Sequence, residues 1–436
     1  MRLRLLAIAT LLSWSAAASA AETDTTSPCP PFTFALHGFV SGSVYGQDAN
    51  FGPSEGQQSL YLNPQTPGLH APNQDRLVLG GDVRQSRFNF SVAGPKVFGG
   101  ATPKAVLEVD FFGGFGSGNF GDVSLTQRLR WAYAELNWGD HRVLFGQTND
   151  LIFTIAPVSL AHIAFPYGYG SGNIGWRRPG VFGFDNFKLG GGTNLEFAWE
   201  VGRSQWADAG GIGNSTVTPT TGAAAGGDQY GFNMGEGSAM PAVEGRLTLS
   251  QGPTWQVFTT GHWNRVDRKG VDQPTVFTKY KDLDVVALNA GAKLNVGPLS
   301  LAATGYTGKN LAPLVGNFLQ FQANDIGDIH EMGGWVQAGL NLTKELSVWG
   351  YAGVAKPKAE DAYAAKLGKI QNVTTAGMLQ YRDGGYAIGL EWIHMYTQTR
   401  VYQSASTTAP VTAAQAAQLS TGLSGNQVLL SGNYFF

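Results

Sequence analysis

The sequence predicts an all-β fold: a transmembrane antiparallel β-barrel of about sixteen strands, with short periplasmic turns and long extracellular loops. Three observations predict it. The chain begins with an export signal, its connections alternate in length, and its last strand ends on an aromatic residue. No segment approaches the ~18 consecutive apolar residues that a transmembrane helix needs, so strands must make any membrane crossing.

The N-terminal residues have the order of a secretory signal. Two arginines, an apolar core and an A-x-A cleavage site follow one another within residues 1–20. We therefore expect 1–20 to be a signal peptide, 21–31 a short periplasmic segment, and 32–436 an outer-membrane β-barrel. Outer-membrane lipid and lipopolysaccharide are its expected surroundings.

Composition fits a membrane barrel and argues against a nucleic-acid partner. The chain has 60 glycines, 12% aromatic residues and only 14% charged residues, which suits strands with one lipid face and one wet face. Loss of Arg2 and Arg4 with the signal leaves 27 of the 29 basic residues against 31 acidic ones. The mature chain therefore has no excess of basic residues that would favour a nucleic-acid partner. The single Cys29 cannot pair within the chain and is interpreted as an incidental thiol.

The strand candidates are runs of alternating apolar and polar residues bounded by glycine, proline and asparagine. The first ten lie near 33–45, 82–93, 104–112, 125–138, 142–149, 180–189, 194–203, 240–250, 255–265 and 283–296, and the same pattern continues to the end of the chain. Tight turns are predicted at 139–140, 190–192, 251–253, 297–298, 343–345 and 383–385. Long loops are predicted at 150–179, 204–239, 266–282, 309–329, 356–369 and 401–424. Short turns at one end and long loops at the other are typical of an outer-membrane barrel.

Within the strands, alternate residues have opposite character. In 286–296 valine, leucine and alanine alternate with asparagine and lysine, and in 195–201 leucine, phenylalanine and tryptophan alternate with glutamate. The same alternation runs to the C-terminal Phe436. One face of each strand is therefore predicted to contact lipid and the other water. A soluble β-sandwich would also alternate, but it would not account for the export signal and the loop lengths.

Catalytic motifs are few and weak. Residues 116–121 match G-x-G-x-x-G and residues 52–56 match G-x-S-x-G, but both lie in predicted loops, and Pro53 adjoins the would-be nucleophile Ser54. No histidine spacing fits a metal, and no cofactor or catalytic residue is assigned. The alternatives to a channel are an outer-membrane hydrolase assembled from several strands and a non-conducting structural or adhesive barrel.

Charged residues gather on one face of three consecutive predicted strands. They are Arg87, Glu108, Asp110, Arg128 and Arg130. Adjacent strands lie ~4.8 Å apart, so these side chains could form one charged wall inside the lumen. Arg84 has the opposite parity and would need a bulge, or a position above the membrane, to join them. The arginines outnumber the carboxylates, although they could merely neutralise them and stiffen the wall.

The predicted loop at 150–179 is unusually apolar for an outer loop. It carries one acid, Asp150, and two adjacent arginines, Arg177 and Arg178. Because apolar loop residues favour burial, we expect the loop to fold into the barrel, narrow the pore and favour anions over cations. Alternatively, it packs over a neighbouring subunit.

Several short segments of this region occur together in one known family. They are, in order, Arg84–Phe88, Leu107–Gly114, Leu129–Arg130, Ala132–Tyr133, Leu144–Thr148 and Arg178–Pro179. Over about 84–180 the chain resembles the DcaP-like family of trimeric outer-membrane porins. The resemblance implies a sixteen-stranded homotrimer that admits small anionic solutes such as dicarboxylates, with inward arginines as selectivity elements. It does not extend to the family's N-terminal helical coiled coil.

Overall fold

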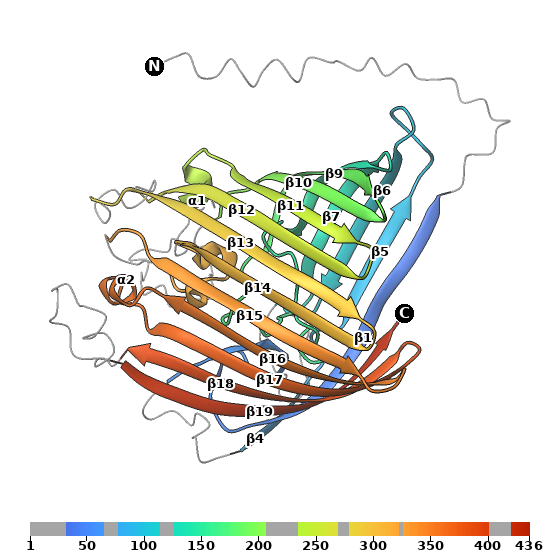
Figure 1. Cartoon of the computed structure of the whole chain (residues 1–436). Coiled ribbons are helices and arrows are strands. Elements are labelled where there is room, and N and C mark those ends of the chain that lie inside the picture. The colour runs from blue at the N-terminus through green and yellow to red at the C-terminus, as the bar shows by residue number, and fades with distance from the viewer. Residues whose placement is uncertain are drawn as a thin grey trace.

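Long antiparallel strands make up most of the described chain (Figure 1). The computed structural model describes residues 32–64, 77–113, 126–205, 234–268, 279–321, 326–400 and 420–436. The barrel strands in chain order are β1 (Thr33–Gln47), β4 (Val78–Asp82), β5 (Arg87–Ala93), β6 (Thr102–Asp110), β7 (Arg128–Asn137), β8 (His141–Asn149), β9 (Arg177–Gly190), β10 (Thr193–Gly202), β11 (Ala242–Gln251), β12 (Trp255–Asp267), β13 (Asp282–Val296), β14 (Leu299–Lys309), β15 (His330–Asn341), β16 (Leu346–Pro357), β17 (Lys369–Asp383), β18 (Tyr386–Arg400) and β19 (Ser420–Phe435).

These strands close into one antiparallel barrel. β19 pairs back with β1, from Phe39 opposite Phe435 to Gln47 opposite Gln427. β4 and β5 both pair with β1, one after the other along its length, so they count as a single interrupted strand. The 17 strands of the sheet therefore make a closed 16-strand barrel, as the sequence predicts.

The interruption between β4 and β5 corrects the single strand expected at 82–93. β1 pairs with β4 up to Ser43 opposite Asp82 and with β5 from Phe39 opposite Arg87. Between them the ladder gives way to side-chain contacts, because the hydroxyl of Ser86 accepts the Ser41 N–H at 3.0 Å and donates to the Val83 carbonyl at 2.8 Å. The break supplies the irregularity that Arg84 needs to turn toward the interior.

Connections alternate in length around the barrel. The short ones span 94–101, 138–140, 191–192, 252–254, 297–298, 342–345 and 384–385, and all lie at one end, called here the short-turn end. The longer ones begin and end at the opposite, long-loop end. Phe436 lies at the short-turn end, where its carbonyl accepts the Gly38 N–H at 3.0 Å.

The two faces of the barrel wall differ sharply in polarity. Leu288 is 54% exposed on the outside, whereas the next residue, Asn289, is 5% exposed and faces inward. Leu390 and Glu391 show the same contrast, at 51% and 0%. This alternation gives an apolar outer surface and a polar inner one. No helix in the described parts of the chain has the length and apolar character to cross a membrane.

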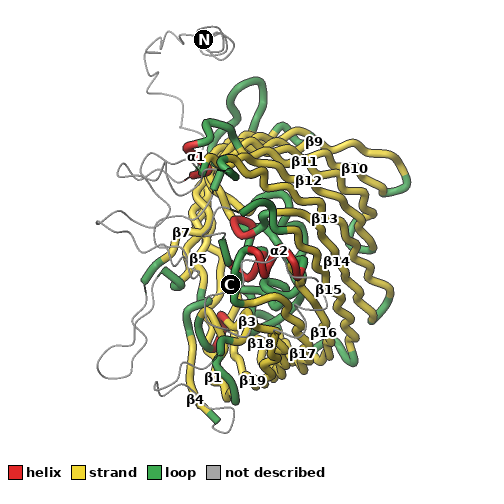
Figure 2. Tube along the Cα trace, turned by 90° about the vertical axis from the view of Figure 1, so that its left-hand side faces the viewer, coloured by secondary structure: helices red, strands yellow, loops and turns green. Residues whose placement is uncertain are grey.

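Segments from the long-loop end fill much of the interior (Figure 2). Residues 48–64 contribute the small hairpin of β2 (Phe51–Pro53) and β3 (Ser59–Leu62) around the 3-10 helix η1 (Gly56–Gln58). Residues 310–321 contribute the 3-10 helices η2 (Ala312–Leu314) and η3 (Asn317–Leu319). The short helices α1 (Met234–Gly237) and α2 (Ala359–Ala364) also belong to long-loop connections.

Candidate functional site

The five charged residues predicted to share a wall do meet. Asp110 lies 2.6 Å from Arg128 and 2.9 Å from Arg130. Glu108 lies 2.7 Å from Arg130 and 3.7 Å from Arg87. Three guanidinium groups thus face two carboxylates, and the wall keeps one net positive charge. Paired charges of this kind also stiffen the strands that carry them.

Arg84 reaches the same region from the break between β4 and β5. Its guanidinium forms an ion pair with Asp82 at 2.8 Å and lies 4.8 Å from the centre of the Phe112 ring. It also donates to the hydroxyl of Ser54 at 3.1 Å, so the G-x-S-x-G serine is a structural acceptor here. Because Asp82 neutralises it, Arg84 adds no charge to the wall.

Arg177 lies at the start of β9, close to the wall, and is 6% exposed. Its guanidinium stacks 4.1 Å from the ring of Trp176. Trp176 packs against Phe165 and Tyr169, each with ring centres 5.7 Å away. Within the described part of the chain no carboxylate or other hydrogen-bond acceptor pairs with Arg177. It is therefore a second uncompensated positive charge, next to that of the wall.

The sequence predicts Arg178 as a free positive charge in the loop, but the structure shows it buried and paired. It is 2% exposed and contacts Asp150 at 2.9 Å, Glu200 at 3.1 Å and Glu244 at 3.5 Å. His262 adds a contact to Glu244 at 2.7 Å. The loop itself ends at 176, so both arginines belong to β9. Arg178 is thus the cation of a buried network that joins the loop to β10 and β11.

Residues 150–176, called here the inner loop, run from that network across the barrel interior. At its start, the N–H of Leu151 donates to Glu200 at 3.2 Å and that of Ile152 to Glu244 at 2.7 Å. Farther along, the side-chain amide of Gln337 on β15 holds both the N–H and the carbonyl of Val158, at 2.7 and 2.8 Å.

Glu391 on β18 holds the far side of the inner loop. This buried carboxylate accepts hydrogen bonds from the Ser159 hydroxyl, the Leu160 N–H and the Ala161 N–H, each at 2.7 Å, and from the hydroxyl of Tyr167. Charge-assisted hydrogen bonds are the strong ones, so four on one carboxylate fix this part of the loop. Neither Glu391 nor Gln337 stands out in the sequence, because both look like ordinary inward-facing strand positions.

The inner loop also packs against the other segments inside the barrel. Asn372 on β17 donates to the carbonyls of Leu60 and Gly170, each at 3.0 Å, and so joins the inner loop to residues 48–64. The Gly175 N–H donates to the Leu314 carbonyl at 2.6 Å, which joins it to residues 310–321. The three segments form one packed body on the inside of β13–β19.

Two other features of the sequence have separate outcomes. The G-x-G-x-x-G match at 116–121 lies outside the described residues. Across the ranges that the structure describes, no three His, Cys, Asp or Glu residues come together as a metal site would require.

Comparison with known proteins identifies the architecture. No family model matches the chain, and no curated protein matches it in sequence. The crystal structure of the outer-membrane channel DcaP of Acinetobacter baumannii matches it with a TM-score of 0.63 at 15% identity, over 93% of this chain and 97% of that one. The barrel has the porin fold.

Two further porin structures agree with that assignment. OmpF of Salmonella typhi matches with a TM-score of 0.52 at 11% identity, over 92% of this chain and 97% of that one. OmpT of Vibrio cholerae matches with a TM-score of 0.51 at 10% identity, over 93% of this chain and 98% of that one. Identities this low show a shared porin fold, which leaves the solute to be argued from this chain's own residues.

Proposed function

We propose that the protein is an outer-membrane porin for passive diffusion of small hydrophilic solutes, with a preference for anions such as dicarboxylates. The observation that carries the preference is the charge beside the inner loop. Arg87, Arg128, Arg130 and Arg177 face only Glu108 and Asp110 there. Charged rings at a narrow point of a pore favour ions of opposite sign.

The mechanism needs no bound cofactor and no catalysis. An anion in the barrel loses part of its hydration, and the two excess positive charges offset that loss because the field between low-dielectric walls is strong. A cation meets the same field as a barrier. Arg178 contributes little to this selectivity because three carboxylates already surround it.

Arg177→Ser tests the anion preference directly. Arg177 has no carboxylate partner, so its removal changes the local charge by one without leaving an acid unpaired. We expect the anion-to-cation permeability ratio to fall about two- to fivefold at low salt, which corresponds to ~0.5–1 kcal/mol, and to fall less at high salt. The measurement is the reversal potential of purified protein in planar bilayers under a salt gradient.

Arg265→Ser is the matched control. Arg265 pairs with Asp284 and is 47% exposed on the outside of the barrel, so its loss should leave the reversal potential unchanged. If Arg177→Ser also kept the wild-type reversal potential at low salt, the anion preference would be wrong. If the wild-type protein gave no conductance at all, the channel itself would be wrong.

The proposal includes export and orientation. Residues 1–20 act as a cleaved signal, the short-turn end faces the periplasm, and the long-loop end faces outward among lipopolysaccharide, in a homotrimer. This orientation is the usual one for barrels with unequal connections.

Cysteine labelling tests the orientation with two exposed lysines. Lys96 lies in a short turn and Lys358 at the long-loop end, so each can be replaced by cysteine in a Cys29→Ser background. A membrane-impermeant maleimide on intact cells should label Lys358→Cys but not Lys96→Cys. Both variants should react equally after the cells are broken. Labelling of Lys96→Cys alone on intact cells would reverse the orientation.

A further inference from the structure

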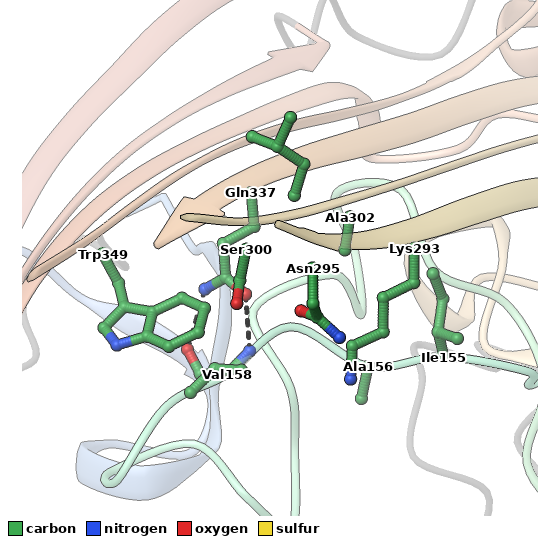
Figure 3. Close-up of a pocket in the computed structure, with 10 residues that line it drawn as sticks. Ile155, Ala156, Val158, Lys293, Asn295, Ser300, Ala302, Gln337 and Trp349 are labelled. Carbon is green, nitrogen blue, oxygen red and sulfur yellow. Dashed lines mark hydrogen bonds between the residues drawn. The ribbon is translucent and has the colours of Figure 1, made fainter. Parts of the chain in front are cut away.

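A cavity of about 190 Å³ lies between the inner loop and strands β13–β16 (Figure 3). Its loop side is formed by Ile155, Ala156 and Val158. Its wall side carries Lys293 and Asn295 close to the end of β13. Because both residues lie near the 297–298 turn, the cavity opens into the short-turn half of the lumen. None of the groups in the charged wall lines it.

We propose that this cavity is a second solute site, which binds small monocarboxylates with an unbranched apolar tail. The site deepens the proposed function, since a solute would reach it by diffusion through the porin. Its chemistry differs from that of the arginine wall, because Lys293 is the one charged lining residue and the other lining residues are neutral and mostly apolar.

The apolar part of the cavity is preformed. The indole N–H of Trp349 donates to the Ser347 hydroxyl at 3.0 Å, which fixes the ring that borders the cavity. Gln337 holds Val158 from the wall side by two hydrogen bonds. Ala302 completes this surface with a small side chain. A fixed aromatic and aliphatic lining gains affinity from an apolar ligand without first being ordered.

The polar end suits a single negative charge. Lys293 is exposed and faces the lumen, and in the described ranges no carboxylate lies within ion-pair distance of its ammonium group. Ser300 lies farther along the cavity, opposite Asn295 on the neighbouring strand, and Figure 3 shows it on the side of Gln337. The amide nitrogen of Asn295 is already engaged with the Pro253 carbonyl at 2.6 Å. The single ammonium group of Lys293 thus matches one carboxylate.

Size restricts the occupant further. Pockets for drug-sized ligands enclose ~300–1,000 Å³, so this cavity suits a solute of only a few carbon atoms. A dicarboxylate of the same length would bring its second charge toward Trp349, at the end far from Lys293, where no cation is available among the cavity-lining residues. Burying an unpaired carboxylate is costly. A monocarboxylate should therefore bind better than a dicarboxylate.

The test is equilibrium binding to the purified full-length protein in detergent, followed by saturation-transfer NMR. The probes are pentanoate, its neutral analogue pentanamide, and the dicarboxylate glutarate. We expect pentanoate to bind most tightly. Lys293→Met should weaken pentanoate about two- to fivefold, as loss of one partly exposed charge contact would, and should leave pentanamide unchanged. Trp349→Leu should weaken both pentanoate and pentanamide.

Lys188→Met is the matched control. Lys188 is also a lumen-facing lysine at the short-turn end, but it lies on β9, outside the cavity, and pairs with Asp140 at 2.9 Å. Its loss should leave pentanoate binding unchanged. If Lys188→Met and Lys293→Met weakened pentanoate binding equally, the effect would come from overall charge and the proposed site would be wrong. Tighter binding of glutarate than of pentanoate would also contradict the site.

Failure of the site and failure of the channel are separable, because the binding assay needs no conductance. If the protein conducts in bilayers but neither Lys293→Met nor Trp349→Leu changes its affinity for pentanoate, the proposed porin function stands and the proposed binding site is wrong. If the protein never conducts but its affinity for pentanoate depends on Lys293, the proposed binding site stands and the proposed porin function is wrong.

Discussion

Glu391→Gln is expected to increase single-channel conductance, because it releases the far side of the inner loop. The carboxylate accepts four hydrogen bonds. A glutamine keeps one oxygen for the N–H groups of Leu160 and Ala161, but its NH₂ group then donates toward the hydroxyls of Ser159 and Tyr167, whose own hydrogens lose their acceptor. Leaving such buried groups unsatisfied costs ~1–3 kcal/mol each. The loop should then move away from β18 and widen the path.

The measurement is the distribution of single-channel conductances in planar bilayers, compared between wild type, Glu391→Gln and Glu391→Ala. Glu345→Gln is the control, since Glu345 lies in the 342–345 turn, far from the inner loop, and its carboxylate accepts a hydrogen bond from the hydroxyl of nearby Thr343. A single conductance equal to that of the wild type in both Glu391 variants would mean that the inner loop does not limit the pore.

Arg178→Met is expected to give the largest loss of stability among the arginine variants. It keeps much of the side-chain volume but leaves Asp150, Glu200 and Glu244 buried without their cation. Removing one partner of a buried ion pair costs ~3–5 kcal/mol. The expected result is a lower midpoint of thermal unfolding, measured by the heat-dependent gel mobility of the detergent-solubilised barrel.

Two comparisons make this result specific. Arg265→Met breaks a pair on the outer surface, where solvent screens the charges, and should leave the unfolding midpoint nearly unchanged. Burial raises the pKa of Asp150 above its usual range. A carboxylate with a raised pKa takes up its proton sooner as the pH falls, so the deficit of Arg178→Met should shrink toward acidic pH. A deficit that was small, or that grew on acidification, would contradict a buried charge network.

The sequence predicts the barrel well because its rules are local. A period of two places Leu288 outside and Asn289 inside, and glycine-rich turns such as 190–192 mark strand ends wherever they occur. The charged wall was also predictable, because its members lie on consecutive strands at matching parity. Two features of the sheet differ from expectation. β19 begins at Ser420, inside the loop expected at 401–424, and the break between β4 and β5 depends on the side-chain contacts of Ser86 with β1.

The site was less predictable because its decisive contacts join residues far apart in the chain. Arg177 and Arg178 are neighbours with the same chemistry, yet only Arg178 meets Glu200 and Glu244. Glu391 meets Leu160 across 231 positions of sequence. Such pairings arise only when the barrel closes and the inner loop packs inside it, so no local pattern in one sequence reveals them.

The inner loop connects walls that the barrel's circumference keeps apart. It is hydrogen-bonded to β10 and β11 at one end and to β15 and β18 farther along, so it links opposite sides of the barrel wall. The barrel therefore cannot flatten in one direction without straining the hydrogen bonds between the inner loop and the wall strands. Lateral compression of the surrounding bilayer and the size of the internal aperture are therefore mechanically coupled in this protein.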